Sequence, residues 1–489
     1  MPFNNSQNTP YFRMSPLDQT AFGEFEVAEL TPSVQLTFPY SINPREVVSQ
    51  ANQSGSVTQA NSMAVVSSGA ATNSSGLMES RKHVHYNAGQ GTMARFTAVF
   101  TAGVSGGTQW MGVGSVDDGF FFGYSGAQFG IMHRNGGQRE IQTLTVTTGA
   151  TGAGNVTVTL DGDTKAIAVA DGDSTDTVAR KIAAGDYSDV GTGWDAYQVG
   201  TKVEFVSWDA KAHSGTFSIA GQSTAGSFNE DVVGVAPTET FVAQNAWNGF
   251  ALEDTLDATK GNVYQVRYQY LGFGKIEFSI EDGATGEFVM VHTILYANKN
   301  TVPSLGQPTL PVHAEAKNTT NNTAIVLKTA SIAAFTEGKD AELQGGRTAM
   351  VGSETGISTT EKPILTVRNR THYQGKENRV SVRLVQVNAS ADGNKTVEYF
   401  GKADATLTGA SFSDVATTTS VLQTDTTATA ITGGTTIGSV TFPQSGVLSF
   451  PLVEEEIFLN PGEQVTFSGV AIATASVDMA TGVTFIEQF

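Results

Sequence analysis

The residues whose types and spacing could do chemistry are few, and two histidines are the first to consider. His83 and His85 stand two positions apart in a stretch that we expect to be a strand, so both imidazoles share one strand face. Two such rings could contribute to a zinc site, but zinc needs at least one further protein ligand, and no HExxH or other ligand-spaced partner is near. We interpret both as ordinary strand-face residues and expect neither a metal ion nor a cofactor.

Paired carboxylates are the second candidate chemistry, because a glycosidase requires only two facing acids, which a sequence cannot exclude. The possible members are Glu140, Glu277, Glu281 and Asp282. We favour the alternative that they are solvated residues of turns and strand faces. A serine hydrolase would need a Gly-x-Ser-x-Gly elbow followed by Asp and His, and the chain has no convincing one. We therefore expect no catalytic residues and no enzymatic activity.

A cluster of acidic residues, Asp171, Asp173 and Asp176, has the look of a calcium loop. Such a loop ends on a bidentate Glu, and none follows at the required distance. The run Asp171-Gly172-Asp173-Ser174 offers N-cap side chains before a stretch with apolar residues at helical spacing, so capping of a helix is the better explanation. We expect a short helix through Ala184 and no bound metal.

Three aromatic residues, Trp110, Tyr124 and Trp247, could stack on sugars if they are exposed. The alternative is packing in a hydrophobic core, which we favour for all three.

The composition indicates a β protein. The 489 residues include 53 Gly and only 15% charged residues, and Thr, Ser, Asn and Val are abundant. Because there is no Cys, disulfides and thiolate metal sites are excluded. The net charge of -19 opposes binding to a phosphate backbone, so we expect no nucleic-acid partner. No run of 18 apolar residues occurs, and we expect no membrane insertion.

The elements that would position any site are short antiparallel strands. Residues 110–144 hold four strand-like runs between turns, with Phe120, Phe121 and Phe122 as one aromatic run and Asp-Gly and Asn-Gly pairs as punctuation. We expect a tight meander with one covered face. After Leu144 the predicted order of elements changes to two strands, a helix and two further strands.

We predict a mostly β fold of antiparallel jelly-roll and sandwich domains with a small inserted α+β module. The expected divisions are an N-terminal arm and linker (1–76), a jelly roll (77–144 plus 242–336), the inserted module (145–241), a polar connector (337–360) and a C-terminal β-sandwich (361–489).

Three segments add a resemblance: YNAGQGTMARFTAVF (86–100), DDGFFFGYSGAQFGIMHRNGGQREIQTLTV (117–146) and NVYQVRYQYLGFGKIEFSIEDGATGEFVMVH (262–292). They resemble a family of virion structural proteins from tailed phages and large DNA viruses of aquatic microbes, and the sheet they imply is similar to a concanavalin-type jelly roll. The resemblance implies receptor-binding or decorating parts, sometimes with sugar binding. It supplies no catalytic motif.

Our functional hypothesis is a non-enzymatic virion structural protein, a fibre, spike or capsid-attached part. We expect a homo-oligomer, with a trimer favoured, because association would cover sheet edges and the arm. The arm would bind other virion proteins, and a host-surface glycan is a further expected partner. The alternative is a carbohydrate-binding module or glycan-degrading enzyme on a jelly-roll scaffold.

Overall fold

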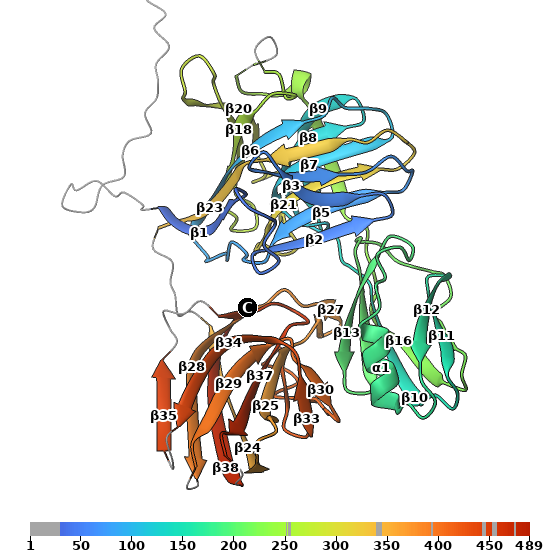
Figure 1. Cartoon of the computed structure of the whole chain (residues 1–489). Helices are drawn as coiled ribbons and strands as arrows, with labels where there is room; N and C mark the ends of the chain where they lie inside the picture. Colours follow the sequence, from blue (N-terminus) through green and yellow to red (C-terminus); the bar gives the residue numbers. More distant parts are fainter. Residues whose placement is uncertain are drawn as a thin grey trace, which may run out of the picture.

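The computed structural model describes residues 30–250, 252, 256–338, 345–392, 395–442, 446–451, 457–473 and 476–489, and every count below refers to them. The fold is mostly β, and its sheets are antiparallel. Three units meet at a central junction: a jelly roll at the top of Figure 1, an inserted module at lower right and a C-terminal sandwich at lower left. No helix in these ranges is long and apolar enough to cross a membrane.

The jelly roll consists of two facing antiparallel sheets. The nine-stranded sheet contains β1 (Leu30–Thr37), β3 (Ser56–Ala60), β4 (Met63–Ser67), β6 (Gly91–Phe100), β18 (Asn262–Tyr268), β19 (Ile276–Glu281), β20 (Phe288–Ile294), β22 (Val326–Thr329) and β23 (Ser331–Glu337). The seven-stranded sheet has the order β17 (Thr238–Ala243), β9 (Gln128–Asn135), β8 (Gly119–Ser125), β7 (Gly107–Gly114), β21 (Val312–Asn318), β5 (Ser75–Ser80) and β2 (Val47–Asn52). A short 3-10 turn, η1 (Gln244–Ala246), follows β17.

Aromatic side chains from both sheets interlock in the jelly-roll core. Phe122 on β8 contacts Tyr264 on β18 and Phe278 on β19, with ring centroids 4.9 and 5.3 Å apart. The expected meander of residues 110–144 is confirmed for β7, β8 and β9, and Gly126, at a φ of 60°, makes the two-residue turn between β8 and β9. The fourth run leaves the jelly roll and becomes β10 (Ile141–Thr148) of the module.

The predicted N-terminal arm and linker is wrong for residues 30–76, which supply strands of both jelly-roll sheets. Val34, Leu36 and Phe38 are buried in the shared core, and the small residues Ala64 and Val66 pack there with no exposed surface. The part from Ser41 to Gly76 was too weakly apolar to suggest a core of its own, but it completes one that other strands provide. Residues 1–29 lie outside the described residues.

The inserted module leaves the jelly roll after β9 and returns at β17. Its four-stranded sheet contains β10, β13 (Trp194–Val199), β14 (Lys202–Ser207) and β16 (Ala225–Val232), and its three-stranded sheet β11 (Gly154–Leu160), β12 (Asp163–Val169) and β15 (Ser218–Ala220). The helix α1 (Thr175–Ala183) packs through Val178 and Ile182, and Ser174 caps it by accepting a hydrogen bond from Thr177 N–H.

The C-terminal unit is a sandwich of two sheets. The first contains β24 (Gly346–Ile357), β38 (Val477–Gln488), β28 (Ser381–Asp392), β35 (Gly446–Pro451) and β36 (Phe458–Leu459); the second β31 (Ser413–Asp414), β32 (Leu422–Asp425), β25 (Lys362–Asn369), β37 (Gln464–Ala471), β29 (Val397–Ala403) and β34 (Thr435–Phe442). Two small pairs, β26 (His372–Tyr373) with β27 (Lys376–Glu377) and β30 (Thr406–Thr408) with β33 (Ala430–Thr432), complete it.

The polar connector predicted for residues 337–360 is also wrong in part, because β24 spans 12 of its residues and pairs along β38. Every second residue of β24 faces solvent, so its sequence is polar although it is an edge strand of the sheet, paired with β38.

Candidate functional site: a cleft between the jelly roll and the module

Three rows of side chains project from the outward face of the seven-stranded sheet, the face turned away from the core. The register of β2, β5, β21 and β7 aligns residues directly across the strands. The rows are Asn52, Ser75, Lys317 and Thr108; Gln50, Leu77, Glu315 and Trp110; Val48, Glu79, His313 and Gly112. Because strand residues alternate between faces, this polar pattern follows directly from the register.

The same face is flat toward β8 and β9, because aromatic rings lie on glycines there. A Cβ on Gly123 would come within 2.9 Å of the Trp110 ring, and one on Gly130 within 2.7 Å of the Phe241 ring. Trp110 and Phe241 contact each other with centroids 5.9 Å apart. The Trp110 ring is therefore buried and not available to stack on a ligand.

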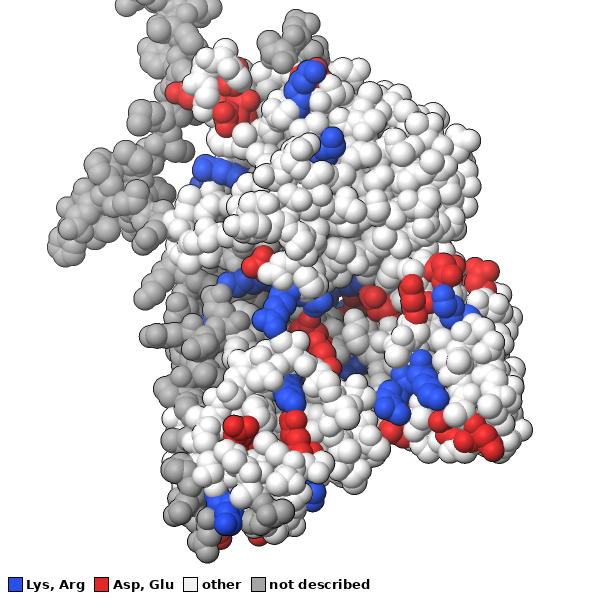
Figure 2. Space-filling model, viewed as in Figure 1, with Lys and Arg blue, Asp and Glu red and all other residues white. Residues whose placement is uncertain are grey.

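The module covers one side of this face and leaves a cleft of about 360 Å³, within the usual size range of ligand sites. Asn52, Glu315 and Lys317 line it from the jelly roll, and Trp208, Asp209 and Lys211 line it from the module. Figure 2 shows few charged side chains on the visible face of the jelly roll and many along its border with the two lower units.

Two buried acceptors in the cleft lack a hydrogen bond of ordinary length to any described residue. The Asn52 side chain donates through Nδ2 to the carbonyls of Ser188 (2.6 Å) and Gly191 (3.1 Å), which leaves Oδ1 unfilled. Glu315 Oε2 makes no hydrogen bond of ordinary length, but it lies 3.5 Å from His313 Nε2 and 3.6 Å from Arg134 Nη2. Asn52 is 1% exposed and Glu315 7%. Buried acceptors without donors are costly, so a ligand that offers hydroxyl donors would be stabilised here.

Glu315 stays ionised because cations surround it. Burial alone would raise the pKa of Glu315, but His313 and the charge of Arg134 lower it below the ordinary range. His313 lies between two acids, with Nδ1 2.8 Å from Glu79 Oε1 and Nε2 3.5 Å from Glu315 Oε2. Burial would lower the pKa of His313, and its acidic neighbours raise it instead. An ionised Glu315 can accept hydrogen bonds but cannot serve as a general acid.

The module's wall of the cleft is held by Asp209. This carboxylate accepts from Thr192 Oγ1 at 2.8 Å and lies 2.9 Å from Lys211 Nζ and 3.1 Å from His213 Nε2. Trp208 lies over Gly193, where a Cβ would meet its ring at 2.1 Å. The indole is thus fixed in place at the edge of the cleft.

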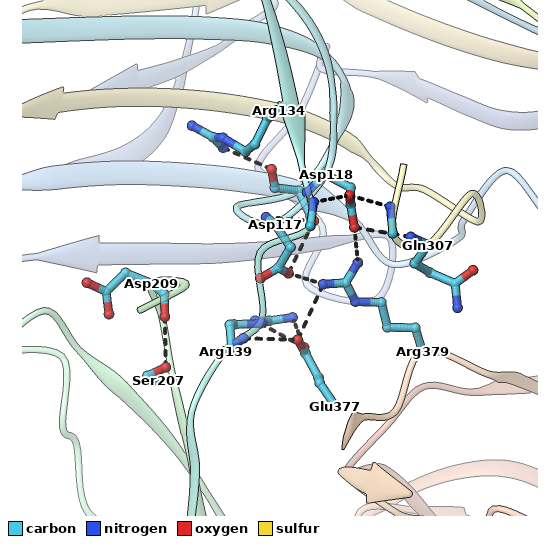
Figure 3. A network of polar contacts seen from close by, with 12 residues as sticks. Asp117, Asp118, Arg134, Arg139, Ser207, Asp209, Gln307, Glu377 and Arg379 are labelled. Carbon is cyan, nitrogen blue, oxygen red and sulfur yellow. Dashed lines mark hydrogen bonds and ion pairs between the residues drawn. The ribbon is translucent and has the colours of Figure 1, made fainter. Parts of the chain in front are cut away.

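A buried ion cluster fastens the C-terminal sandwich to the jelly roll beside this cleft (Figure 3). Arg379 reaches up from the sandwich and contacts Asp117, Asp118 (3.2 Å) and Glu377 (3.4 Å), while Arg139 lies 2.8 Å from Glu377. Asp117 is fully buried, and burial raises its pKa to about 6 against the opposing charge of Arg379. With three acids and two arginines, the cluster holds one more acid than base.

A second buried pair ties the sandwich to the module. Arg368 Nη2 lies 2.5 Å from Glu204 Oε2, and Thr371 Oγ1 donates to the same oxygen at 2.7 Å. Burial would raise the pKa of Glu204, but the charge of Arg368 lowers it. The module is therefore held by an ion pair to the sandwich, and the sandwich is held to the jelly roll by the ion cluster. Together these contacts fix the positions of both walls of the cleft.

The histidines singled out in the sequence do not form a metal site. His83 and His85 flank Val84, which makes an isolated bridge to Leu310, and His85 Nδ1 lies 3.4 Å from Thr309 Oγ1. No group of three or more His, Asp or Glu side chains among the described residues could hold a metal ion. Near the acidic cluster, Asp173 binds Lys181 at 2.5 Å and Ser174 caps α1, so the capping interpretation is confirmed.

Three of the four carboxylates considered as catalytic pairs, Glu277, Glu281 and Asp282, lie on β19 and in the turn after it. Glu140 is in another unit and is fully buried, so its interpretation as a solvated residue is wrong. Glu140 is buried in the module, where it accepts from Gln142 Nε2 (2.8 Å) and His213 N–H (2.6 Å). Glu277 pairs with Lys275, and Asp282 accepts from the turn between β19 and β20. The core-packing interpretation of the remaining two aromatics, Tyr124 and Trp247, is confirmed, because both pack against the jelly-roll core.

The cleft residues Asn52, Glu315, Lys317 and Trp208 were missed in the sequence. Asn52 stood in a segment interpreted as linker, and Trp208 lay in the module, where no site was expected. The alternation of His313, Glu315 and Lys317 along one strand face was the available signal.

Comparisons with known proteins give a fold likeness only. No protein-family model matches the chain, and no curated protein matches it. Similar solved structures include arcelin-5, a lectin-like defense protein from Phaseolus vulgaris (9% identity, 63% of this chain and 99% of that chain, TM-score 0.27). Others are the Emp47p carbohydrate recognition domain (9%, 64% and 98%, TM-score 0.27) and lectin I from Ulex europaeus in complex with the methyl glycoside of α-L-fucose (9%, 62% and 98%, TM-score 0.25).

The titles of these neighbours describe lectins, a lectin-like protein and a carbohydrate recognition domain. Identities and TM-scores this low carry no argument about the site of this chain. The resemblance to virion proteins receives no support from the comparisons.

Proposed function

We propose that the chain binds carbohydrate, without cleaving it, in the cleft between the seven-stranded sheet and the module. The observation that carries the proposal is Asn52 Oδ1, a buried acceptor without a donor among the described residues, in a cleft edged by the fixed Trp208 ring. Sugars offer many hydroxyl donors and apolar ring faces, which suit acceptors and an indole respectively.

The absence of turnover is part of the proposal and is supported by the state of the cleft acids. Glu239 and Glu315 both lie beside Arg134, at 2.9 and 3.6 Å. The lowered pKa of Glu315 leaves it without a proton to give to a leaving group. Carboxylates that are held in contact with Arg134 favour binding of a sugar over its hydrolysis.

A glycan array, combined with an assay for released reducing sugar, tests this proposal. We expect array binding by the full chain, a loss of at least about tenfold in affinity for Asn52→Ala and for Trp208→Ala, and no sugar release. Tyr40→Ala is the matched control, because Tyr40 is an aromatic residue 82% exposed and does not line the cleft. No binding on the array, or sugar release abolished by one carboxylate substitution, would refute the proposal.

A second candidate function is self-association as a virion structural component, and one surface favours association. On the outward face of the first sandwich sheet, two adjacent rows carry no charge: Ser353, Ala480, Ser390 and Val447; Val351, Gly482, Asn388 and Ser449. Val351 is 80% exposed and Val447 78%. An uncharged face is where two copies of charge -19 could approach at least electrostatic cost.

Light scattering after size exclusion tests this candidate. We expect an oligomer that Val351→Asp dissociates, while Val233→Asp, at an exposed valine on the module, leaves it intact. A monomeric wild-type chain would exclude self-association and leave the virion role unsupported. The molar mass from the same measurement gives the number of copies and so tests the expected trimer.

A further inference from the structure

Three cations and three carboxylates line the cleft: Arg134, Lys211 and Lys317, and Asp209, Glu239 and Glu315. Arg134 is paired with Glu239 at 2.9 Å, and Lys211 with Asp209 at 2.9 Å. Lys317 also lines the cleft, yet no ion pair or hydrogen bond joins its ammonium group to any other described residue. Its charge helps to hold Glu315 ionised, although no carboxylate among the described residues lies within ion-pair distance of the ammonium group.

The sheet register explains why Lys317 has no carboxylate within ion-pair distance. Its neighbours across the strands are Ser75 on β5 and Thr108 on β7, which carry no charge. The next outward residue on its own strand is Glu315, which already faces His313 at 3.5 Å and Arg134 at 3.6 Å. The lysine thus stands in a row of neutral polar side chains at the open end of the face.

The unfilled acceptor of Asn52 lies in this same row. Asn52 on β2 is opposite Ser75 on β5, and Ser75 is opposite Lys317 on β21. Two strand spacings put the backbones of Asn52 and Lys317 about 10 Å apart. That span leaves room for one sugar ring with a hydrogen bond at either end, and Ser75 beneath it adds a hydroxyl.

We infer that the ligand of this cleft is an anionic glycan whose sugar ring bears a carboxylate, a uronic acid. The carboxylate pairs with the Lys317 ammonium, and a hydroxyl on the other side of the ring donates to Asn52 Oδ1. This inference rests on the proposed function and narrows it from carbohydrates in general to uronate-containing ones. The acids of the cleft do not repel such a ligand strongly, because Glu239 and Glu315 face Arg134 and Asp209 faces Lys211.

Calorimetric titration with matched sugars tests the inference. The probes are trisaccharides of galacturonate, glucuronate and mannuronate, each beside its carboxyl-reduced, neutral counterpart. We expect at least one uronate to bind about tenfold more tightly than its neutral counterpart, a preference of about 1.4 kcal/mol. The preference should shrink at high salt because an ion pair near solvent is screened.

Lys317→Met is the variant of choice, since it retains the aliphatic length of the side chain and removes the charge. It should bind the uronate and the neutral sugar equally, at the neutral sugar's wild-type affinity. Lys202→Met, which removes an exposed lysine of the module outside the cleft, should keep the preference.

The outcomes separate this inference from the proposed function. Equal wild-type affinity for charged and neutral members, or binding of array glycans but of no uronate, overturns the uronate inference and retains carbohydrate binding. A preference that survives Lys317→Met also overturns it, because the charge would then come from elsewhere. Failure to bind any glycan overturns both.

Discussion

Replacing Arg379 with methionine is expected to release the C-terminal sandwich from the jelly roll. The guanidinium is 13% exposed and contacts Asp117, Asp118 and Glu377, of which Asp117 is fully enclosed. Methionine keeps much of the side-chain volume but leaves three buried carboxylates with Arg139 alone. Breaking a buried ion pair by removing one partner costs about 3–5 kcal/mol, a large part of the roughly 5–15 kcal/mol that stabilises a typical domain.

The loss of stability should separate the units at the junction before any unit unfolds, because each unit has its own hydrophobic core. Calorimetry should resolve an earlier transition in Arg379→Met, since linked domains need not unfold as one. Small-angle scattering should show a larger radius of gyration at temperatures below that transition. The penalty should also shrink on acidification, as Asp117 becomes protonated.

Arg347→Met is the control, because Arg347 is exposed on β24 and has no ion pair among the described residues. It should change stability by less than about 0.5 kcal/mol. If Arg379→Met matched this control in calorimetry and in scattering, the ion cluster would not hold the junction and the reasoning would be refuted.

Three further predictions concern the pH dependence, the core and the helix. The pKa of Asp117 is raised above its ordinary value, so its contribution to stability is present at low pH and is lost as the pH rises through about 6. The urea midpoint of wild-type unfolding should therefore fall from pH 5 to 7. The midpoint of Asp117→Asn should fall less. Phe122→Ala removes a fully buried ring from the jelly-roll core and should cost about 3–5 kcal/mol in urea unfolding. Ser174→Ala removes the N-cap and should cost about 1 kcal/mol, seen as faster hydrogen exchange in α1, whereas an unchanged exchange rate would contradict the capping role.

The fold class could be predicted from the sequence because period-two alternation and turn pairs are local signals. The run at Phe120 to Phe122 and the Asp-Gly pair at Asp118 and Gly119 specified adjacent strands of one sheet. Residues 30–76 were misassigned because their apolar content is low. Whether such a segment joins a core depends on partners such as β23 and β21, which lie far along the chain.

The cleft could not be predicted, because it depends on register between distant strands. Asn52, Ser75 and Lys317 become a row only when β2 pairs with β5 and β5 with β21, and a shift of one residue would turn all three toward the core. Trp208 joins them only because the module packs on that face. Ionic contacts between units, such as Arg379 with Asp117, leave no local pattern in the sequence.

The pairing of β1 with β23 has a consequence for synthesis of the protein. Leu30 lies opposite Glu337, so the first described strand waits for a partner that is translated 307 residues later. At about 5–20 residues per second, that delay is on the order of 15 to 60 s. During this time β1 and its alternating Val34, Leu36 and Phe38 are without their sheet neighbour, and these apolar side chains cannot yet be buried against it.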